Sequence, residues 1–188
     1  FYRVQRVEPK RYEAIMLPHA GWRVCGDILA ETIARTKIPN TVVIIGPKHT
    51  GAGANWSVSA DSTWRFPHAD VPVDTALAKR LSEDVPGLRL ESEAHREEHG
   101  AEVLVPFLHH ANPNLKIVPI ALGAASFDDL APLSAALKSI DALFVISSDM
   151  NHFANDAENR RLDQLALVQL ETGNARGLYD VCIEHQIS

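Results

Sequence analysis

Four short runs of apolar residues, rich in Ile, Val and Leu, predict the strands of a buried sheet. They occupy residues 13–17, 41–45, 116–122 and 142–147. Within each run the apolar residues are largely continuous rather than alternating with polar ones. Continuous apolarity is typical of strands that are covered on both faces, as in parallel sheets.

Amphipathic patterns predict helices between and after these strands. The predicted helices cover, approximately, residues 22–36, 74–83, 98–110, 127–139, 156–171 and 175–185. Strands that alternate with helices in this way predict a layered α/β/α domain with a mostly parallel central sheet. The stretch 55–67 differs, because polar and apolar residues alternate there and a turn-like Ala-Asp-Ser interrupts them. We predict a small β-hairpin or an edge excursion of the sheet at this point.

Composition and charge mainly exclude classes of function. The 188 residues suit one domain, and 46% hydrophobic with 22% charged residues is an ordinary globular composition. No apolar run approaches the roughly 18–20 residues that a membrane helix needs. A net charge of −6 without a long basic cluster disfavours nucleic-acid binding. Two cysteines make no disulfide framework and no signal peptide is visible, so we expect a cytoplasmic protein.

Polar residues follow three of the four predicted strands. His19 lies in LPHAGW after the first strand, and His49 lies in GPKHTG after the second. Asp149 and His152 lie in SSDMNH after the fourth. In open α/β sheets, ligands bind outside the carboxyl ends of the strands. The pattern therefore predicts that these side chains meet at one edge of the sheet.

The segment EEHGAEVLVPF adds two further candidates. His99 and Glu102 are three residues apart, so on a helix they share a face. Pro106 cannot donate to the Glu102 carbonyl, so either that carbonyl is freed or the helix bends there. The spacing leaves two interpretations open: a contribution to the site, or an amphipathic helix with an acidic first turn.

Histidines together with one carboxylate or thiolate are a common set of metal ligands. Two histidines and one anionic ligand suit Fe(II), and the same ligands accept Zn or Cu. Cys25, in GWRVCGD, could be a third ligand or a redox thiol, but a small packed residue is the favoured interpretation. Cys182 is expected to pack in a core. The remaining loop and helix-end histidines with an expected surface role are His68, His109, His110 and His185.

Other motifs do not predict nucleotide binding or serine-type hydrolysis. GAGAN at 51–55 lacks both the P-loop Lys-Ser/Thr and the dinucleotide spacing. We expect it to form a flexible loop beside His49, in which Gly51 and Gly53 let the backbone pass close to a ligand. SSD at 147–149 lacks the nucleophile elbow of α/β-hydrolases.

In this order and spacing, LPHAGW, GPKHTG, EEHGAEVLVPF and SSDMNHF resemble the Memo family. Its prokaryotic members are also called AmmeMemoRadiSam system protein B. The resemblance covers about residues 14–188 and implies a single Memo-like domain over residues 1–188. The implied fold is similar to class III (LigB-type) extradiol dioxygenases, which are non-haem iron enzymes. Because the sequence opens at Phe1 and stops inside a helix-like pattern, we expect it to be incomplete at both ends.

The resemblance also implies a metal pocket. His19 and His49 match two of the family's metal ligands, and the third is a cysteine that is followed by glycine. By register that cysteine is expected beyond Ser188, so Cys182 is not assigned to it. The implied metal is Fe(II) or Cu rather than Zn. Its binding is expected to depend on the cysteine ligand that this sequence lacks.

Further pocket roles follow from the same resemblance. His152 matches a histidine beside the metal that acts as acid or base, and Asp149 is expected to position it. His99 and Glu102 match polar residues that line the pocket, where they would orient substrate or water.

Two hypotheses for function follow. The first is a metal-dependent redox enzyme, dioxygenase-like, with an unknown substrate. The second is a non-catalytic binding or adaptor module that holds a peptide or a small anionic ligand in the same pocket. Zinc-assisted hydrolysis is a third and weaker hypothesis. The family resemblance also implies a radical-SAM enzyme and an AMMECR-type protein as partners.

Overall fold

The computed structural model of this chain describes residues 7–187. By its internal contacts the chain divides into two compact units, Phe1–Ser148 and Asp149–Ser188, which we describe separately as unit 1 and unit 2. The single domain expected over residues 1–188 stays a prediction.

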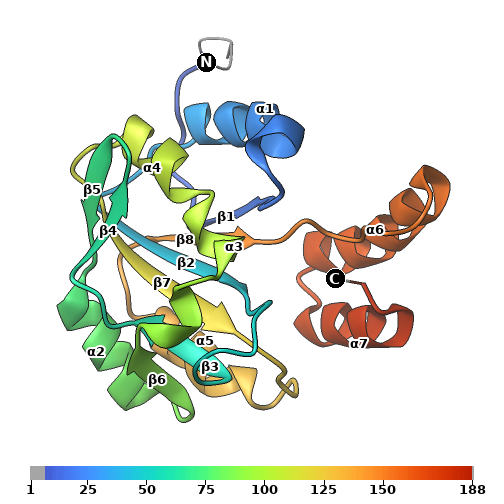
Figure 1. Ribbon diagram of the computed structural model, residues 1–188. Coiled ribbons are helices and arrows are strands. Elements are labelled where there is room, and N and C mark those ends of the chain that lie inside the picture. The colour runs from blue at the N-terminus through green and yellow to red at the C-terminus, as the bar shows by residue number, and fades with distance from the viewer. Residues whose placement is uncertain (1–6, 188) are drawn as a thin grey trace. The chain divides into compact units, whose positions relative to one another are not determined.

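Unit 1 is built on a six-stranded sheet (Figure 1). The strand order is β1-β8-β2-β7-β3-β6, and all neighbours are parallel except β3 and β7. The mostly parallel sheet and the four predicted strands are therefore confirmed. The strands are β1 (Ala14–Leu17), β2 (Thr41–Pro47), β3 (Trp56–Ser59), β6 (Leu88–Glu91), β7 (Lys116–Leu122) and β8 (Leu143–Ser147).

Helices cover both faces of this sheet, which confirms the predicted α/β/α layers. In β2, Val42 and Ile44 belong to one apolar core and Val43 belongs to the other. The first core also contains buried residues of α1 (Trp22–Ala34) and α4 (Val105–Ala111). The second contains those of α2 (Thr75–Asp84) and α5 (Leu130–Leu137). Because both faces are buried, the central strands are apolar throughout.

The helix predicted near 98–110 is two helices. The short α3 (His99–Glu102) ends before Val103, and α4 begins again at Val105. Pro106 lies in the first turn of α4. Backbone N–H groups there have no partner within the helix, so a proline, which lacks an N–H, costs no hydrogen bond. The predicted interruption near Pro106 is therefore confirmed, and it leaves α3 as a separate turn that carries His99.

The hairpin predicted over residues 55–67 has different partners in the structure. β3 joins the main sheet between β7 and β6. The hairpin is formed instead by β4 (Thr63–Phe66) and β5 (Ala69–Pro72), which pair through a two-residue turn. Local alternation cannot reveal that the partners of β3 lie far along the chain. Its polar residues Ser57 and Ser59 are buried because each has a hydrogen-bond partner within the fold.

Unit 2 contains α6 (Asp156–Glu171) and α7 (Ala175–His185), close to the predicted bounds. The two helices pack around Leu162, Ala166 and Ile187. Each begins with an asparagine whose side chain accepts a hydrogen bond from a backbone N–H of the first turn. Among the helices of residues 7–187, none is both long and apolar enough to cross a membrane.

Candidate metal centre

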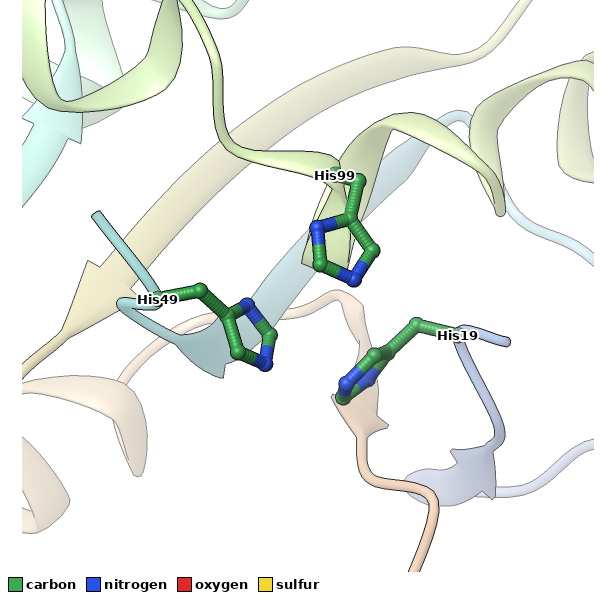
Figure 2. A group of neighbouring side chains, drawn as sticks. All are labelled: His19, His49 and His99. Carbon is green, nitrogen blue, oxygen red and sulfur yellow. The ribbon is translucent and has the colours of Figure 1, made fainter. Parts of the chain in front are cut away.

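Three histidines of unit 1 come together at one edge of the sheet. His19 follows β1, His49 follows β2, and His99 is the first residue of α3. Figure 2 shows the three imidazole rings converging from separate segments. The ring centroids are 5.1 Å apart for His19–His49, 5.6 Å for His19–His99 and 4.5 Å for His49–His99. One potential ligand atom from each ring lies within 4.8 Å of the others.

The strand order explains why the first two histidines meet. β1, β8 and β2 are neighbours and parallel, so their carboxyl ends share one edge. The segment that carries His99 reaches the same edge by close packing on β2. A Cβ atom built on Gly46 would lie 3.3 Å from the Ser147 Cβ and 3.6 Å from the Gly100 carbonyl carbon. Glycine at position 46 therefore permits α3 to approach the sheet closely.

A buried carboxylate holds His49. Glu98 is 3% exposed, and its Oε1 accepts a hydrogen bond from the His49 ring Nδ1 at 2.7 Å. Its Oε2 accepts from the His49 backbone N–H at 2.6 Å, and Oε1 also accepts from the Gly100 N–H at 2.9 Å. The Nδ1 atom of His99 lies 3.8 Å from the same Oε1. Because Nδ1 donates to the carboxylate, the lone pair of a neutral His49 ring lies on Nε2.

The pKa of the Glu98 carboxyl is lowered. Burial alone would raise it, since a buried carboxylate loses hydration. The hydrogen bond from the His49 ring lowers the pKa, and so do the hydrogen bonds from the backbone N–H groups of Gly100 and His49. The net pKa lies below its ordinary value. The fold therefore favours an ionised Glu98, which is a strong acceptor for the His49 N–H.

His19 is held by a serine at the end of β8. It is 4% exposed, and its Nδ1 lies 2.8 Å from the Ser147 Oγ. The Ser147 hydroxyl also donates to the Gly100 carbonyl oxygen. A hydroxyl has one proton to give, so Ser147 accepts from the Nδ1–H of His19. This arrangement assigns the lone pair of His19 to Nε2, as in His49.

The chemistry of the three rings fits a transition metal. Imidazole nitrogen is a ligand for Zn, Cu and Fe. Ligating histidines commonly donate their second ring nitrogen to a carboxylate or another acceptor, as His49 and His19 do here. Nitrogens bound to one ion at about 2.0–2.1 Å lie roughly 3–4 Å apart. A small inward movement of the half-exposed His49 and His99 rings would achieve this spacing.

Unit 2 contains the other two predicted strand-end residues, Asp149 and His152. His152 donates from Nδ1 to the Met150 carbonyl oxygen at 2.9 Å, which leaves the lone pair on Nε2. Met150 and Phe153 have positive φ angles of 58° and 68°. Such backbone is uncommon outside glycine and often marks a functional segment. The acid/base role of His152 and the positioning role of Asp149 stay predictions.

Glu102 lines a polar cleft of about 270 Å³, whose lining includes Asp61, His95 and Arg96. None of the three clustered histidines is among the residues that line this cleft. Glu102 is exposed and ends α3, while His99 begins it. The predicted role of Glu102 in orienting a substrate stays a prediction.

Both cysteines behave as packed residues. Cys25 lies in the first turn of α1 and is 3% exposed, and its thiol donates to the Ala20 carbonyl oxygen at 2.9 Å. Cys182 packs on the core of unit 2. Burial raises the pKa of the Cys182 thiol, which disfavours the reactive thiolate.

The two glycines beside His49 differ in their surroundings, and the predicted approach of a ligand to them stays a prediction. Gly53 has a φ of 69°, and a Cβ atom there would lie 2.6 Å from the Ala94 backbone nitrogen. Its close approach is therefore to this chain's own backbone. Gly51 faces open space.

Sequence reasoning missed the residues that hold the histidines. The sequence patterns single out neither Glu98 nor Ser147 as a partner of a histidine. Trp22 was also missed: its Nε1–H donates to the Val103 carbonyl oxygen at 2.9 Å, which ties the start of α1 to the end of α3. An acidic residue directly before His99 was a usable signal for a supporting carboxylate, once a metal site was considered.

Comparisons with known proteins agree with the resemblance that the motifs suggested. A family model described as Memo-like protein matches residues 2–188. A MEMO1 family protein of Aquifex aeolicus is 34% identical over 189 residues, which cover 98% of this chain and 69% of that protein. Those of Methanobrevibacter smithii and Desulfurococcus amylolyticus are 31% and 34% identical, over 93% and 91% of this chain. The chain spans 65% and 64% of the length of these last two relatives.

Proposed function

The chain belongs to the Memo family, and from that premise we propose that His19, His49 and His99 hold one transition metal. The observation that carries the proposal is the convergence of three imidazoles, with ligand atoms within 4.8 Å of one another. The hydrogen bonds of two of these rings place the lone pair on Nε2. His99 was predicted to orient a substrate, and the proposal assigns it to the metal instead. The cysteine ligand expected beyond Ser188 stays a prediction.

We further propose that the bound metal serves redox chemistry of the dioxygenase type. A metal in such a site supplies Lewis-acid activation and, if it is Fe or Cu, electron transfer. The chain's own contributions are separable. Glu98 and Ser147 orient two ligand rings, and the bare Nε2 of His152 can accept a proton from a substrate. Fe(II) and Cu are the first candidates for the metal.

Metal content tests the first part. Protein purified without chelators and then reconstituted is expected to hold about one metal ion per chain. His49→Ala is expected to lower the affinity strongly, because one of three ligands is lost. His110→Ala is the matched control, since His110 is an exposed histidine on α4. Equal stoichiometry and affinity for His49→Ala and the unmodified protein would refute the ligand assignment.

Turnover tests the second part. Protein loaded with Fe(II) is given catechols, and protein loaded with Cu is given O₂ and a reductant. Sustained O₂ consumption or ring opening that is lost in His152→Ala supports the enzyme. Metal binding without turnover over a broad substrate set favours the adaptor alternative, in which the site holds a peptide or small anion. The radical-SAM and AMMECR-type partners stay predictions that pull-down of the full-length protein can test.

A further inference from the structure

Gly100 links all three histidines through its two backbone groups. Its N–H donates to Glu98 Oε1 at 2.9 Å, and its carbonyl oxygen accepts from the Ser147 hydroxyl. Glu98 holds His49, and Ser147 holds His19. His99 is the residue directly before Gly100 in the chain. Both Glu98 and Ser147 are 3% exposed, so water does not compete freely for these bonds.

The position of Gly100 is closely constrained by its neighbours. A Cβ atom on Gly100 would lie 3.2 Å from Glu98 Oε1 and 3.4 Å from the Pro47 carbonyl oxygen. Gly46 also packs against Gly100 and Ser147. A displacement of Gly100 would therefore alter the hydrogen bonds of Glu98 and Ser147 together, and would move His99 with them.

The proton count along this network has one solution for neutral rings. Both oxygens of Glu98 accept from backbone N–H groups, so Glu98 is the acceptor and the Nδ1 of His49 is the donor in their contact. Ser147 gives its one proton to Gly100, so the Nδ1 of His19 must also carry a proton. Both rings are then Nδ1–H tautomers, with the lone pair on Nε2. In water the other tautomer is available to a free imidazole, so the network selects the form that can bind a metal through Nε2.

We propose that Glu98 and Ser147 are positioning residues that act through Gly100 as one unit. They set the tautomers of His49 and His19 before any metal arrives, and they couple the positions of all three rings. The statement about affinity rests on the proposed metal site. The statement about tautomers does not, because it concerns the metal-free protein.

The tautomers are measured directly by nitrogen NMR. Protein labelled with ¹⁵N-histidine, free of metal, is studied above the ordinary imidazole pKa of about 6.5, where neutral rings dominate. Long-range proton–nitrogen spectra distinguish protonated from bare ring nitrogens. Signals of His19 and His49, assigned by single substitution, are expected to report Nδ1–H in both. A predominant Nε2–H form in either ring would overturn the proposal, even if every variant failed to fold.

Two variants test the cause. Glu98→Gln keeps the side-chain size, but its amide can donate to Nδ1 of His49, so this ring is expected to shift toward Nε2–H. Ser147→Ala removes the acceptor of the Nδ1–H group of His19, so the Nδ1–H form of this ring is expected to be less populated. Glu97→Gln is the matched control for the first, as an exposed neighbour. Ser57→Ala is the control for the second, because it removes a buried hydroxyl 3.0 Å from His95, outside the cluster. Unchanged tautomers in both test variants would overturn the proposal.

Binding of Zn²⁺ alone, followed by calorimetry, tests the coupling. Loss of a residue that supports a metal ligand typically costs 10–100-fold in affinity, and we expect a loss in this range for each test variant. The double variant is expected to lose less than the product of the two single losses, because each change alone removes a hydrogen bond that holds Gly100 in place. Losses that multiply would overturn the coupling. If Zn²⁺ does not bind at all while both tautomers are as predicted, the metal proposal fails and the tautomer assignment stands.

Discussion

Replacing Glu98 by alanine is expected to destabilise unit 1 by about 2–4 kcal/mol. Glu98 accepts three hydrogen bonds, two of them from backbone N–H groups of His49 and Gly100. An unsatisfied buried donor costs roughly 1–3 kcal/mol. The Gly100 N–H is buried and has no ready access to water, so it contributes most of the loss. The half-exposed His49 ring can turn to water and contributes little.

The removal of a buried charge offsets part of this loss. Burial disfavours the ionised Glu98, and alanine removes that penalty. The pKa of Glu98 is nevertheless lowered on balance, so its hydrogen bonds outweigh the burial penalty in the folded protein. We therefore expect a net loss. Glu98→Gln is expected to lose less, about 1–2 kcal/mol, since its amide oxygen can still accept from the backbone N–H of His49.

Urea unfolding of the metal-free protein measures this effect. All three tryptophans, Trp22, Trp56 and Trp64, lie in unit 1, so their fluorescence reports its unfolding alone. Glu97→Ala is the matched control and is expected to change stability by no more than about 0.5 kcal/mol. If Glu98→Ala were as stable as Glu97→Ala, the supporting role that we give to Glu98 would be wrong.

Three further predictions concern the surroundings of the site. Gly53→Ala is expected to cost about 2 kcal/mol or more, because φ is 69° and the new Cβ would meet the Ala94 backbone; Gly51→Ala, in open space, should be nearly neutral in the same urea assay. Burial lowers the pKa of His95, and this effect outweighs the opposing effect of nearby carboxylates. The His95 imidazole therefore binds a proton more readily in the unfolded chain than in the folded protein. Stability present above about pH 6.5 is then lost as the pH falls toward the folded pKa, and His95→Gln should flatten this slope in unfolding curves. Because burial raises the thiol pKa of Cys182, native protein should react with iodoacetamide more slowly at this residue than urea-unfolded protein does, as peptide mass analysis can show.

The sheet and two of the three clustered histidines could be predicted from the sequence for one physical reason. Continuous apolar runs identified the strands that are buried on both faces, and polar residues directly after them had to lie at the carboxyl edge. His19 and His49 could therefore be placed near each other without coordinates. The break near Pro106 was also predictable, since proline cannot continue the hydrogen bonding of a helix.

The rest of the site depends on packing that short-range patterns do not carry. The closeness of His99 to the other two rings follows from the contact of Gly46 with Gly100 and Ser147, which lie far apart in the sequence. The hydrogen bond between Ser147 and Gly100 spans 47 positions, and that between His19 and Ser147 spans 128. The pairing of β3 with β7 and β6 was missed for the same reason.

The central claim is that His19, His49 and His99 bind one metal ion, and X-ray absorption of the zinc-loaded protein tests it most directly. The spectrum counts nitrogen ligands and identifies imidazole by its multiple scattering. We predict about three imidazoles at about 2.0–2.1 Å, and about two in His99→Ala. A shell without imidazole, or an unchanged imidazole count in His99→Ala, would contradict the account.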